Sequence, residues 1–266
     1  MNTPTGISPA LAPHAGAPAP DAFWRALHRV ATDPYRDAGR FAWQFARGKL
    51  GRDPVFRSLL ERGDLPAGAR IVDIGCGQGL IASLCWALDA AVPAGGWPAT
   101  WPAPPLGCRY TGIELMQRDV DRATAASMRR GDGARLVCGD MRSTDLPPCD
   151  VVVILDVLHY VDHAAQEAVL TRVRDALQPH GRLLVRVGDQ ARASGFLASQ
   201  WVDRLVTMIR GHRVPPTFGR SLSEWIALLQ RLGFTVAPVP MSRGTPFANV
   251  LLVAHAANAA RAAEAT

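Results

Sequence analysis

The sequence predicts an α/β fold in which a mostly parallel sheet is covered by helices on both faces. From residue 65 onward, short apolar runs typical of strands alternate with segments of helical periodicity. The run Asp150–Leu155 is almost wholly apolar, as expected for a strand that is buried on both faces. In such sheets ligands bind outside the carboxyl ends of the strands, so the functional residues are expected in the loops that follow them.

Seven strands and five helices are expected in this part of the chain. The strands are expected at 70–74, 108–115, 134–139, 150–155, 182–187, 234–239 and 249–254. The helices are expected at 80–90, 117–130, 164–177, 196–209 and 221–232. Pro179, His180 and Gly181 form a stop signal after the third of these helices. The run from Ser221 to Glu224 has the pattern of a capping box.

Composition divides the 266 residues into four segments. These are a disordered Pro/Ala/Gly-rich tail over 1–20, a helical cap over 21–64, the α/β domain over 65–256 and a flexible tail over 257–266. The aromatic faces of the cap either pack on the main domain or form a lid over a substrate pocket. Within the domain, 91–108 is a Pro/Gly/Trp-rich insertion that is expected to exclude regular helix. Its Trp97 and Trp101 either pack on a neighbouring surface or cover the bound molecules.

Charge and cysteine content narrow the classes of function. The net charge of +6 comes from scattered arginines, and Lys49 is the only lysine. Without a basic run this indicates a solvated surface and disfavours nucleic acid as a partner. Five cysteines without CxxC spacing indicate reduced thiols and neither a disulfide framework nor a metal site. No apolar run approaches 20 residues and no secretion signal is visible, so we expect no membrane span and a cytoplasmic location.

The strongest single motif is a strand that runs into a glycine-rich turn. Asp73 precedes Gly75, Cys76, Gly77 and Gly79 in a pattern one residue shorter than the dinucleotide fingerprint. Glycines allow the tight turn and the close approach of a ligand. A carboxylate two positions before the first glycine would favour a cationic amino group rather than a pyrophosphate.

Three further motifs follow in order, one after each of the next strands. Glu114 and Leu115 end the second strand, Asp140 and Met141 follow the third, and a run from Asp156 to Tyr160 follows the fourth. With the glycine turn, this order resembles that of the class I S-adenosylmethionine (SAM)-dependent methyltransferases, over about residues 65–255. The resemblance implies a Rossmann-like fold of seven strands with the last one antiparallel. It also implies SAM as the cofactor.

The resemblance assigns expected roles to the motif residues. Glu114 would accept the ribose hydroxyls, Asp140 would reach the adenine amino group, and the fourth motif would lie beside the transferable methyl. The residue types agree, because two carboxylates at neighbouring strand ends suit hydroxyls and an amine rather than phosphates. Glu114 lies 39 positions (114 − 75) after the first glycine, compared with about 20 in the dinucleotide-binding folds. The insertion at 91–108 accounts for the additional residues between the first glycine and Glu114.

The residues that take part in the chemistry depend on the acceptor. In-line methyl transfer needs alignment above all. A carboxylate acceptor needs no base, whereas a phenol, an amine or a ring carbon must lose a proton. His159 is the candidate base and Tyr160 lines the same region. The alternative for His159 is a role in packing alone. Asp156 is expected near the amino group of the cofactor.

The expected function is methyl transfer to a small molecule, such as an aromatic or acyl metabolite. The segment from Gly244 to Leu252 also resembles enzymes of aryl-polyene and fatty-acid-like pigment pathways, whose acceptor would be delivered on a carrier protein. An RNA or protein methyltransferase, a non-catalytic cofactor-binding partner and, more distantly, a nicotinamide oxidoreductase are the alternatives. The oligomeric state stays open.

Overall fold

A single seven-stranded sheet forms the centre of the molecule. The computed structural model describes residues 17–127, 133–188, 218–241 and 249–256. The strand order is β3-β2-β1-β4-β5-β7-β6, with β7 antiparallel to both of its neighbours and β1 to β5 parallel. The strands are β1 (Arg70–Ile74), β2 (Arg109–Glu114), β3 (Ala134–Cys138), β4 (Cys149–Leu155), β5 (Leu177–Gly188), β6 (Phe234–Pro240) and β7 (Asn249–Ala256). The predicted α/β class, the sheet and its antiparallel last strand are confirmed.

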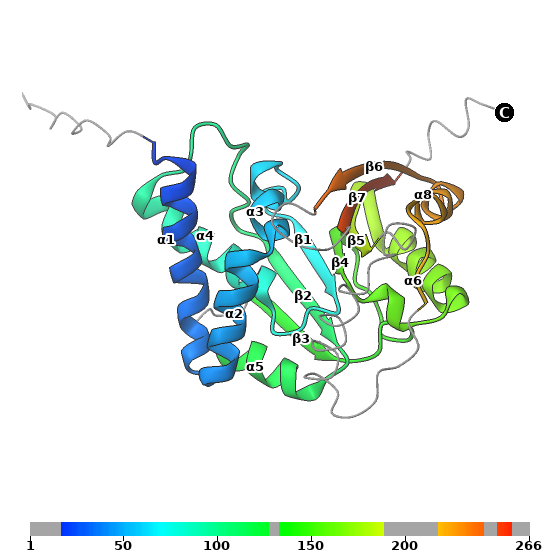
Figure 1. Ribbon diagram of the computed structural model, residues 1–266, viewed down its shortest axis with the longest axis horizontal. Coiled ribbons are helices and arrows are strands. Elements are labelled where there is room, and N and C mark those ends of the chain that lie inside the picture. The colour runs from blue at the N-terminus through cyan, green and yellow to red at the C-terminus, as the bar shows by residue number, and fades with distance from the viewer. Residues whose placement is uncertain (1–16, 128–132, 189–217, 242–248, 257–266) are drawn as a thin grey trace, which may run out of the picture.

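Helices cover both faces of this sheet, as Figure 1 shows. The α-helices are α1 (Pro20–Thr32), α2 (Arg40–Arg52), α3 (Pro54–Glu61), α4 (Leu80–Gly95), α5 (Gln117–Ser127), α6 (His163–Ala176) and α8 (Leu222–Arg231). Two 3-10 turns, η1 (Asp33–Arg36) and η3 (Leu158–Tyr160), complete the described elements. The α8 helix begins with the predicted capping box at Ser221.

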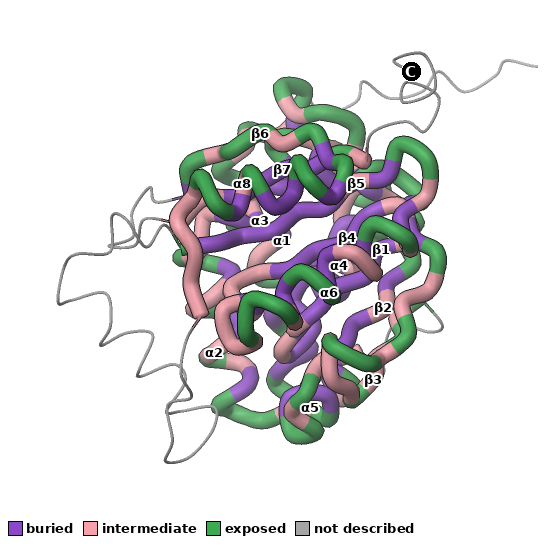
Figure 2. The backbone as a smooth tube through the Cα atoms, turned by 90° about the vertical axis from the view of Figure 1, so that its right-hand side faces the viewer, coloured by how far each residue is buried: buried purple, intermediate pink, exposed green. Residues whose placement is uncertain are grey.

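The core is divided between the two faces because neighbouring strand residues point in opposite directions. Ile71 of β1 packs with the cap helices and α4, whereas Val72 packs with α6 and α8. The same alternation separates Val151 from Val152 in β4. Figure 2 shows the central strands as buried, while the outer turns of α6 and α8 are exposed. The central strands are therefore covered on both sides, as their apolar sequence requires.

The N-terminal cap is part of the main body of the fold. Leu27 and Ala31 of α1 are fully buried, and α1 packs along α4. Phe23, Trp97 and Trp101 form an edge-to-face cluster with ring centroids 5.2–5.8 Å apart. The two tryptophans of the insertion thus pack on α1, the first of the two predicted alternatives.

Two predicted boundaries are wrong. The α4 helix continues to Gly95 through Pro93, although the insertion was expected to exclude helix from residue 91. Ala91 and Val92 pack against the core, so tertiary contacts outweigh the poor helix propensity of proline. The β5 strand begins at Leu177, and its pairing with β4 is irregular between Cys149 and Val151. The expected stop signal therefore lies inside an irregular strand, where His180 takes a positive φ of 66°.

Some predictions fall outside the described residues. These are the helix at 196–209, the end of the helix at 117–130 and nearly all of the two predicted tails. Among the helices that the structure describes, none is both long and apolar enough to cross a bilayer. The described residues also contain no cluster of side chains suited to hold a metal ion.

Candidate active site

The glycine turn after β1 opens a space at the carboxyl edge of the sheet. Gly75 has a φ of 73°, and a Cβ there would lie 2.6 Å from the side chain of Val157, so no larger residue fits. Gly77 has a φ of 54° and nothing within 4 Å of the position of a Cβ. Gly75 therefore lets the turn pack against the β4 loop, while Gly77 keeps the turn open to a ligand.

Two carboxylates stand beside this turn. Glu114, at the end of β2, accepts hydrogen bonds from the backbone N–H of Gly77 at 3.0 Å and of Met116 at 2.9 Å. Asp73 is buried within β1 and accepts a hydrogen bond from the Tyr110 hydroxyl at 2.8 Å. Burial and the nearby charge of Glu114 raise the pKa of Asp73 to about 7, against the opposing effect of Tyr110. A cation bound here would lower that pKa again.

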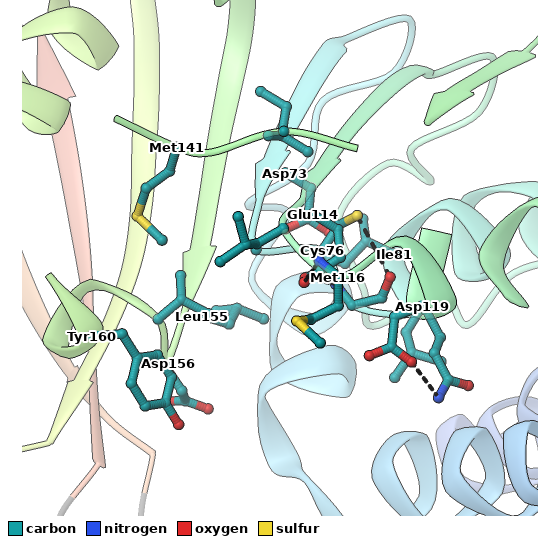
Figure 3. A pocket seen from close by; sticks show the side chains of 18 of the residues that line it. Asp73, Cys76, Ile81, Glu114, Met116, Asp119, Met141, Leu155, Asp156 and Tyr160 are labelled. Atoms are coloured by element: carbon teal, nitrogen blue, oxygen red, sulfur yellow. Dashed lines mark hydrogen bonds between the residues drawn. The ribbon is translucent and has the colours of Figure 1, made fainter. Parts of the chain in front are cut away.

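These residues line a cavity of about 500 Å³. Figure 3 shows Glu114 and Cys76 near its centre, with Asp156 and Tyr160 together at one end. The predicted cofactor residues that line it at β1 and β2 are Asp73, Gly75, Cys76, Gly77, Glu114 and Leu115. Those that line it after β3 and β4 are Asp140, Met141 and Asp156, together with the predicted catalytic residue Tyr160. The sequence-predicted residues thus share one hollow.

Two predicted site residues are not part of this lining. Gly79 lies at the N-cap of α4 with a φ of 70° and contributes to the shape of the turn. The His159 ring lies against Tyr160, with ring centroids 4.1 Å apart, and its Nε2 atom is buried without a partner in the described part of the chain. Burial lowers the pKa of His159, against the opposing charge of Asp156. Its role as a base stays a prediction, and the geometry gives it no contact with the cavity.

Asp140 stands after β3 at the edge of the cavity. Its carboxylate accepts hydrogen bonds from the Arg142 guanidinium, the shortest at 2.6 Å, and from the Arg142 backbone N–H at 2.8 Å. These bonds hold the pKa of Asp140 below its usual range despite partial burial. Asp140 is therefore ionised at neutral pH, and both of its oxygens can accept hydrogen bonds from an amino group.

Asp156 belongs to an ion network that the sequence did not reveal. Arg186 of β5, with only 1% of its side chain exposed, donates Nε to Asp156 at 2.8 Å and also donates Nη2 to it. The same guanidinium donates to both carboxylate oxygens of Asp53 at 2.5 and 2.8 Å. Burial alone would raise the pKa of Asp53, but Arg186 and Lys49 hold it well below its usual range. The network joins the cap, through Asp53 at the N-cap of α3, to the loop after β4.

Lys49 completes this network from α2. Its Nζ lies 2.7 Å from Asp53 Oδ2 and 3.8 Å from Asp156 Oδ2. Two cations and two anions therefore balance each other. Asp156 itself takes a left-handed backbone conformation with a φ of 60°, which is uncommon for a residue other than glycine. Such backbone geometry is typical of functional sites.

The cap contributes cavity residues for which no specific role was predicted. Phe41 and Phe45 of α2 are stacked, with ring centroids 6.4 Å apart, and line the cavity together with Phe56 of α3. Phe41 and Leu115 are the exposed large apolar residues of the described chain, and both lie on this cavity. The cap thus both packs on the domain and covers the cavity. The helical spacing of its aromatic residues was the signal available.

Comparison with known proteins agrees with this geometry. A family model described as a methyltransferase domain matches residues 43–239. The chain belongs to this methyltransferase family. The match extends through the glycine turn, the β2 and β3 motifs and the loop after β4. It confirms the class that the sequence motifs indicated, that of SAM-dependent methyltransferases.

Individual relatives of this methyltransferase are distant. A Streptomyces glaucescens protein described as a tetracenomycin polyketide synthesis 8-O-methyl transferase is 29% identical over 112 residues, which is 41% of this chain and 31% of the relative. The chain thus spans about a third of that protein. The Synechocystis magnesium protoporphyrin IX methyltransferase has a TM-score of 0.53 at 18% identity and covers 90% of this chain and 100% of its own. Human N-acetylserotonin methyltransferase has a TM-score of 0.55 at 18% identity, over 86% and 59% of the two chains. These structures share the fold.

Proposed function

We propose that the protein transfers a methyl group from SAM to an aromatic small molecule. The observation that carries this proposal is the mixed lining of one cavity. Carboxylates and glycines at the strand ends line it together with aromatic side chains of the cap. A polar nucleoside and a planar apolar acceptor would each find matching surface there.

The cofactor half of the proposal rests on Asp73, Glu114 and Asp140. Asp73 offers a buried negative charge to the amino group of the methionine part, and burial makes such pairing strong. Glu114 still has free lone pairs after its two backbone bonds, because an ionised carboxylate has about four acceptor sites. It can therefore accept ribose hydroxyls while it holds the glycine turn in place. Leu115, exposed at the cavity, offers an apolar surface to the adenine ring.

The acceptor half rests on Phe41, Phe45 and Phe56, with Tyr160 at the same end as Asp156. Aromatic rings favour stacked or edge-to-face contacts with a planar ligand. The Streptomyces relative is described as an O-methyl transferase of polyketide synthesis, which agrees with an oxygen acceptor on an aromatic molecule. We further propose a cytoplasmic location and delivery of the acceptor on an acidic carrier protein. An arginine-rich surface would complement the charge of such a carrier.

Incubation with SAM labelled in the transferable methyl and a panel of small phenols and aromatic acids tests this function. We expect labelled product with at least one acceptor in the wild-type protein. The Gly77→Arg variant should form none, because its side chain enters the open space beside Gly77. A protein that binds S-adenosylhomocysteine but transfers no label, even with a cell extract as the source of acceptors, would support the non-catalytic alternative.

The raised pKa of Asp73 predicts that SAM binding weakens as the pH falls. Only the ionised carboxylate attracts the cation, so affinity should drop about tenfold between pH 8 and pH 6 if the pKa is about 7 before binding. Calorimetric titration over this range measures the change. The Asp73→Asn variant controls for titration of SAM itself and should lack the added pH dependence.

The stability of the unbound protein should depend on Asp73 in the opposite direction. A carboxyl whose pKa is raised on folding stabilises the fold most below its unfolded value of 3.8, and this contribution is lost as the pH rises through about 7. Relative to Asp73→Asn, the wild-type protein should lose stability between pH 4 and pH 8. Parallel pH profiles of the two proteins, in binding and in unfolding, would contradict the assigned role.

A further inference from the structure

We propose that Lys49 and Asp156 hold the reacting hydroxyl of the acceptor between them, with Lys49 as a catalytic residue that stabilises the oxygen as its proton leaves. This inference rests on the proposed function and names its acceptor class as phenols, in which the hydroxyl is bonded to the aromatic ring. It assigns the acceptance of the proton to an aspartate of the β4 loop and the stabilisation of the oxygen to a lysine of the cap, in place of His159.

Lys49 and Asp156 are close enough for one hydroxyl oxygen to contact both side chains. Lys49 Nζ forms a direct ion pair with Asp53 at 2.7 Å, but it lies 3.8 Å from Asp156 Oδ2. The second distance exceeds a hydrogen bond. A hydroxyl oxygen beside the pair can lie about 2.8 Å from each atom. It would accept a hydrogen bond from the lysine and donate its proton towards the aspartate.

The rest of the network keeps these two side chains in place. Arg186 is buried and directs its hydrogen bonds to Asp53 and Asp156. Lys49 and Asp156, in contrast, have 29% and 34% of their side chains exposed, and both line the cavity. Asp53 and Arg186 are therefore positioning residues, whereas Lys49 and Asp156 can reach a bound molecule. Phe45 of α2 and Phe56 of α3 line the same cavity and can pack against an aromatic ring.

The transfer step balances with these groups alone. A lone pair of the phenol oxygen forms the new O–C bond to the methyl carbon, and the electron pair of the C–S bond passes to the sulfur. The sulfonium thereby becomes a neutral thioether. The hydroxyl proton moves to the Asp156 carboxylate and leaves from there to solvent. The Lys49 ammonium keeps its charge and stabilises the negative charge that develops on the oxygen.

Binding of 4-nitrophenol to protein loaded with S-adenosylhomocysteine tests this inference without turnover. The phenolate absorbs in the visible range, so the pKa of the bound phenol can be measured by titration. We expect the pKa of bound 4-nitrophenol to be about 1 unit or more higher in Lys49→Met than in the wild-type protein, because a close positive charge is lost. Lys49→Arg should keep most of the wild-type value, and Lys49→Gln should match Lys49→Met.

Controls separate this inference from the proposed function. Arg47→Met, on the same helix but outside the cavity lining, should titrate bound 4-nitrophenol as the wild-type protein does. Wild-type protein that fails to bind S-adenosylhomocysteine would refute the proposed function. If S-adenosylhomocysteine binds normally but the pKa of bound 4-nitrophenol is the same in the wild type, Lys49→Met and Lys49→Gln, the role of Lys49 is overturned. The proposed function is not affected by that result. Absence of saturable 4-nitrophenol binding to the loaded wild-type protein would overturn it as well.

Discussion

Replacing Glu114 with alanine should weaken the binding of S-adenosylhomocysteine by at least a hundredfold. The carboxylate accepts the backbone N–H groups of Gly77 and Met116, and we propose that it also binds the ribose. Hydrogen bonds to a charged group contribute about 1.5–3 kcal/mol each, and about 1.4 kcal/mol corresponds to a tenfold change in affinity. Loss of the ribose bonds and of the held turn therefore predicts this drop. Isothermal titration calorimetry measures it.

Glu167→Ala is the matched control for this variant. Glu167 lies on α6, is exposed and forms a loose ion pair with Arg231 at 3.6 Å. Its removal should leave the affinity within about twofold, because exposed ion pairs contribute little. Thermal melts of both variants report whether they fold. Folded Glu114→Ala protein with wild-type affinity would mean that the cofactor does not lie along the end of β2.

Replacing Arg186 with methionine should lower the free energy of unfolding by about 3–5 kcal/mol. The substitution leaves Asp53 and Asp156 with Lys49 as their remaining cation in the network, while Asp53 stays buried. Urea denaturation followed by circular dichroism measures the change. Asp53 has a lowered pKa, so its stabilising effect is present above its unfolded value of 3.8 and is lost as the pH falls further. The variant should therefore lose the share of this acid-sensitive stability that Arg186 contributes, while the share from Lys49 remains.

Two further variants make this prediction specific. Arg182→Met changes an arginine of the same strand that donates a 3.3 Å hydrogen bond to the Gly63 carbonyl and acts on Asp64 through its charge, without an ion pair to it in the described residues. This variant should cost about 1 kcal/mol or less. Adding Asp53→Asn to Arg186→Met removes the one negative charge that Lys49 alone does not balance, so it should restore part of the loss. If Arg186→Met unfolds no more easily than Arg182→Met, the network does not stabilise the fold.

The succession of strands along the chain and the candidate site residues at the strand ends could be predicted from the sequence because both depend on local patterns. A glycine turn, a carboxylate after β2 and a carboxylate after β3 can be recognised one at a time, and the parallel sheet brings them together at one edge. Even the wrong boundaries, at Pro93 and at Leu177, come from rules that hold locally and were outweighed by packing and by strand pairing.

The ion network could not be predicted in the same way. Lys49 and Asp53 lie on the cap, more than 100 positions before Asp156 and Arg186 in the sequence, and no periodicity links them. The available signal was Arg186 itself, a charged residue within an apolar strand that must be buried on both faces. A buried arginine requires anionic partners, but the sequence does not say which of 23 acidic residues supply them.

The left-handed backbone at Asp156 restricts which amino acids natural variation can accept at this position. Glycine, asparagine and aspartate are the residues that tolerate this conformation best. Only aspartate among them also neutralises a guanidinium. The left-handed backbone and the need for a negative charge beside Arg186 thus favour the same residue. Glycine or asparagine would tolerate the backbone conformation but would leave the Arg186 guanidinium without this anionic partner.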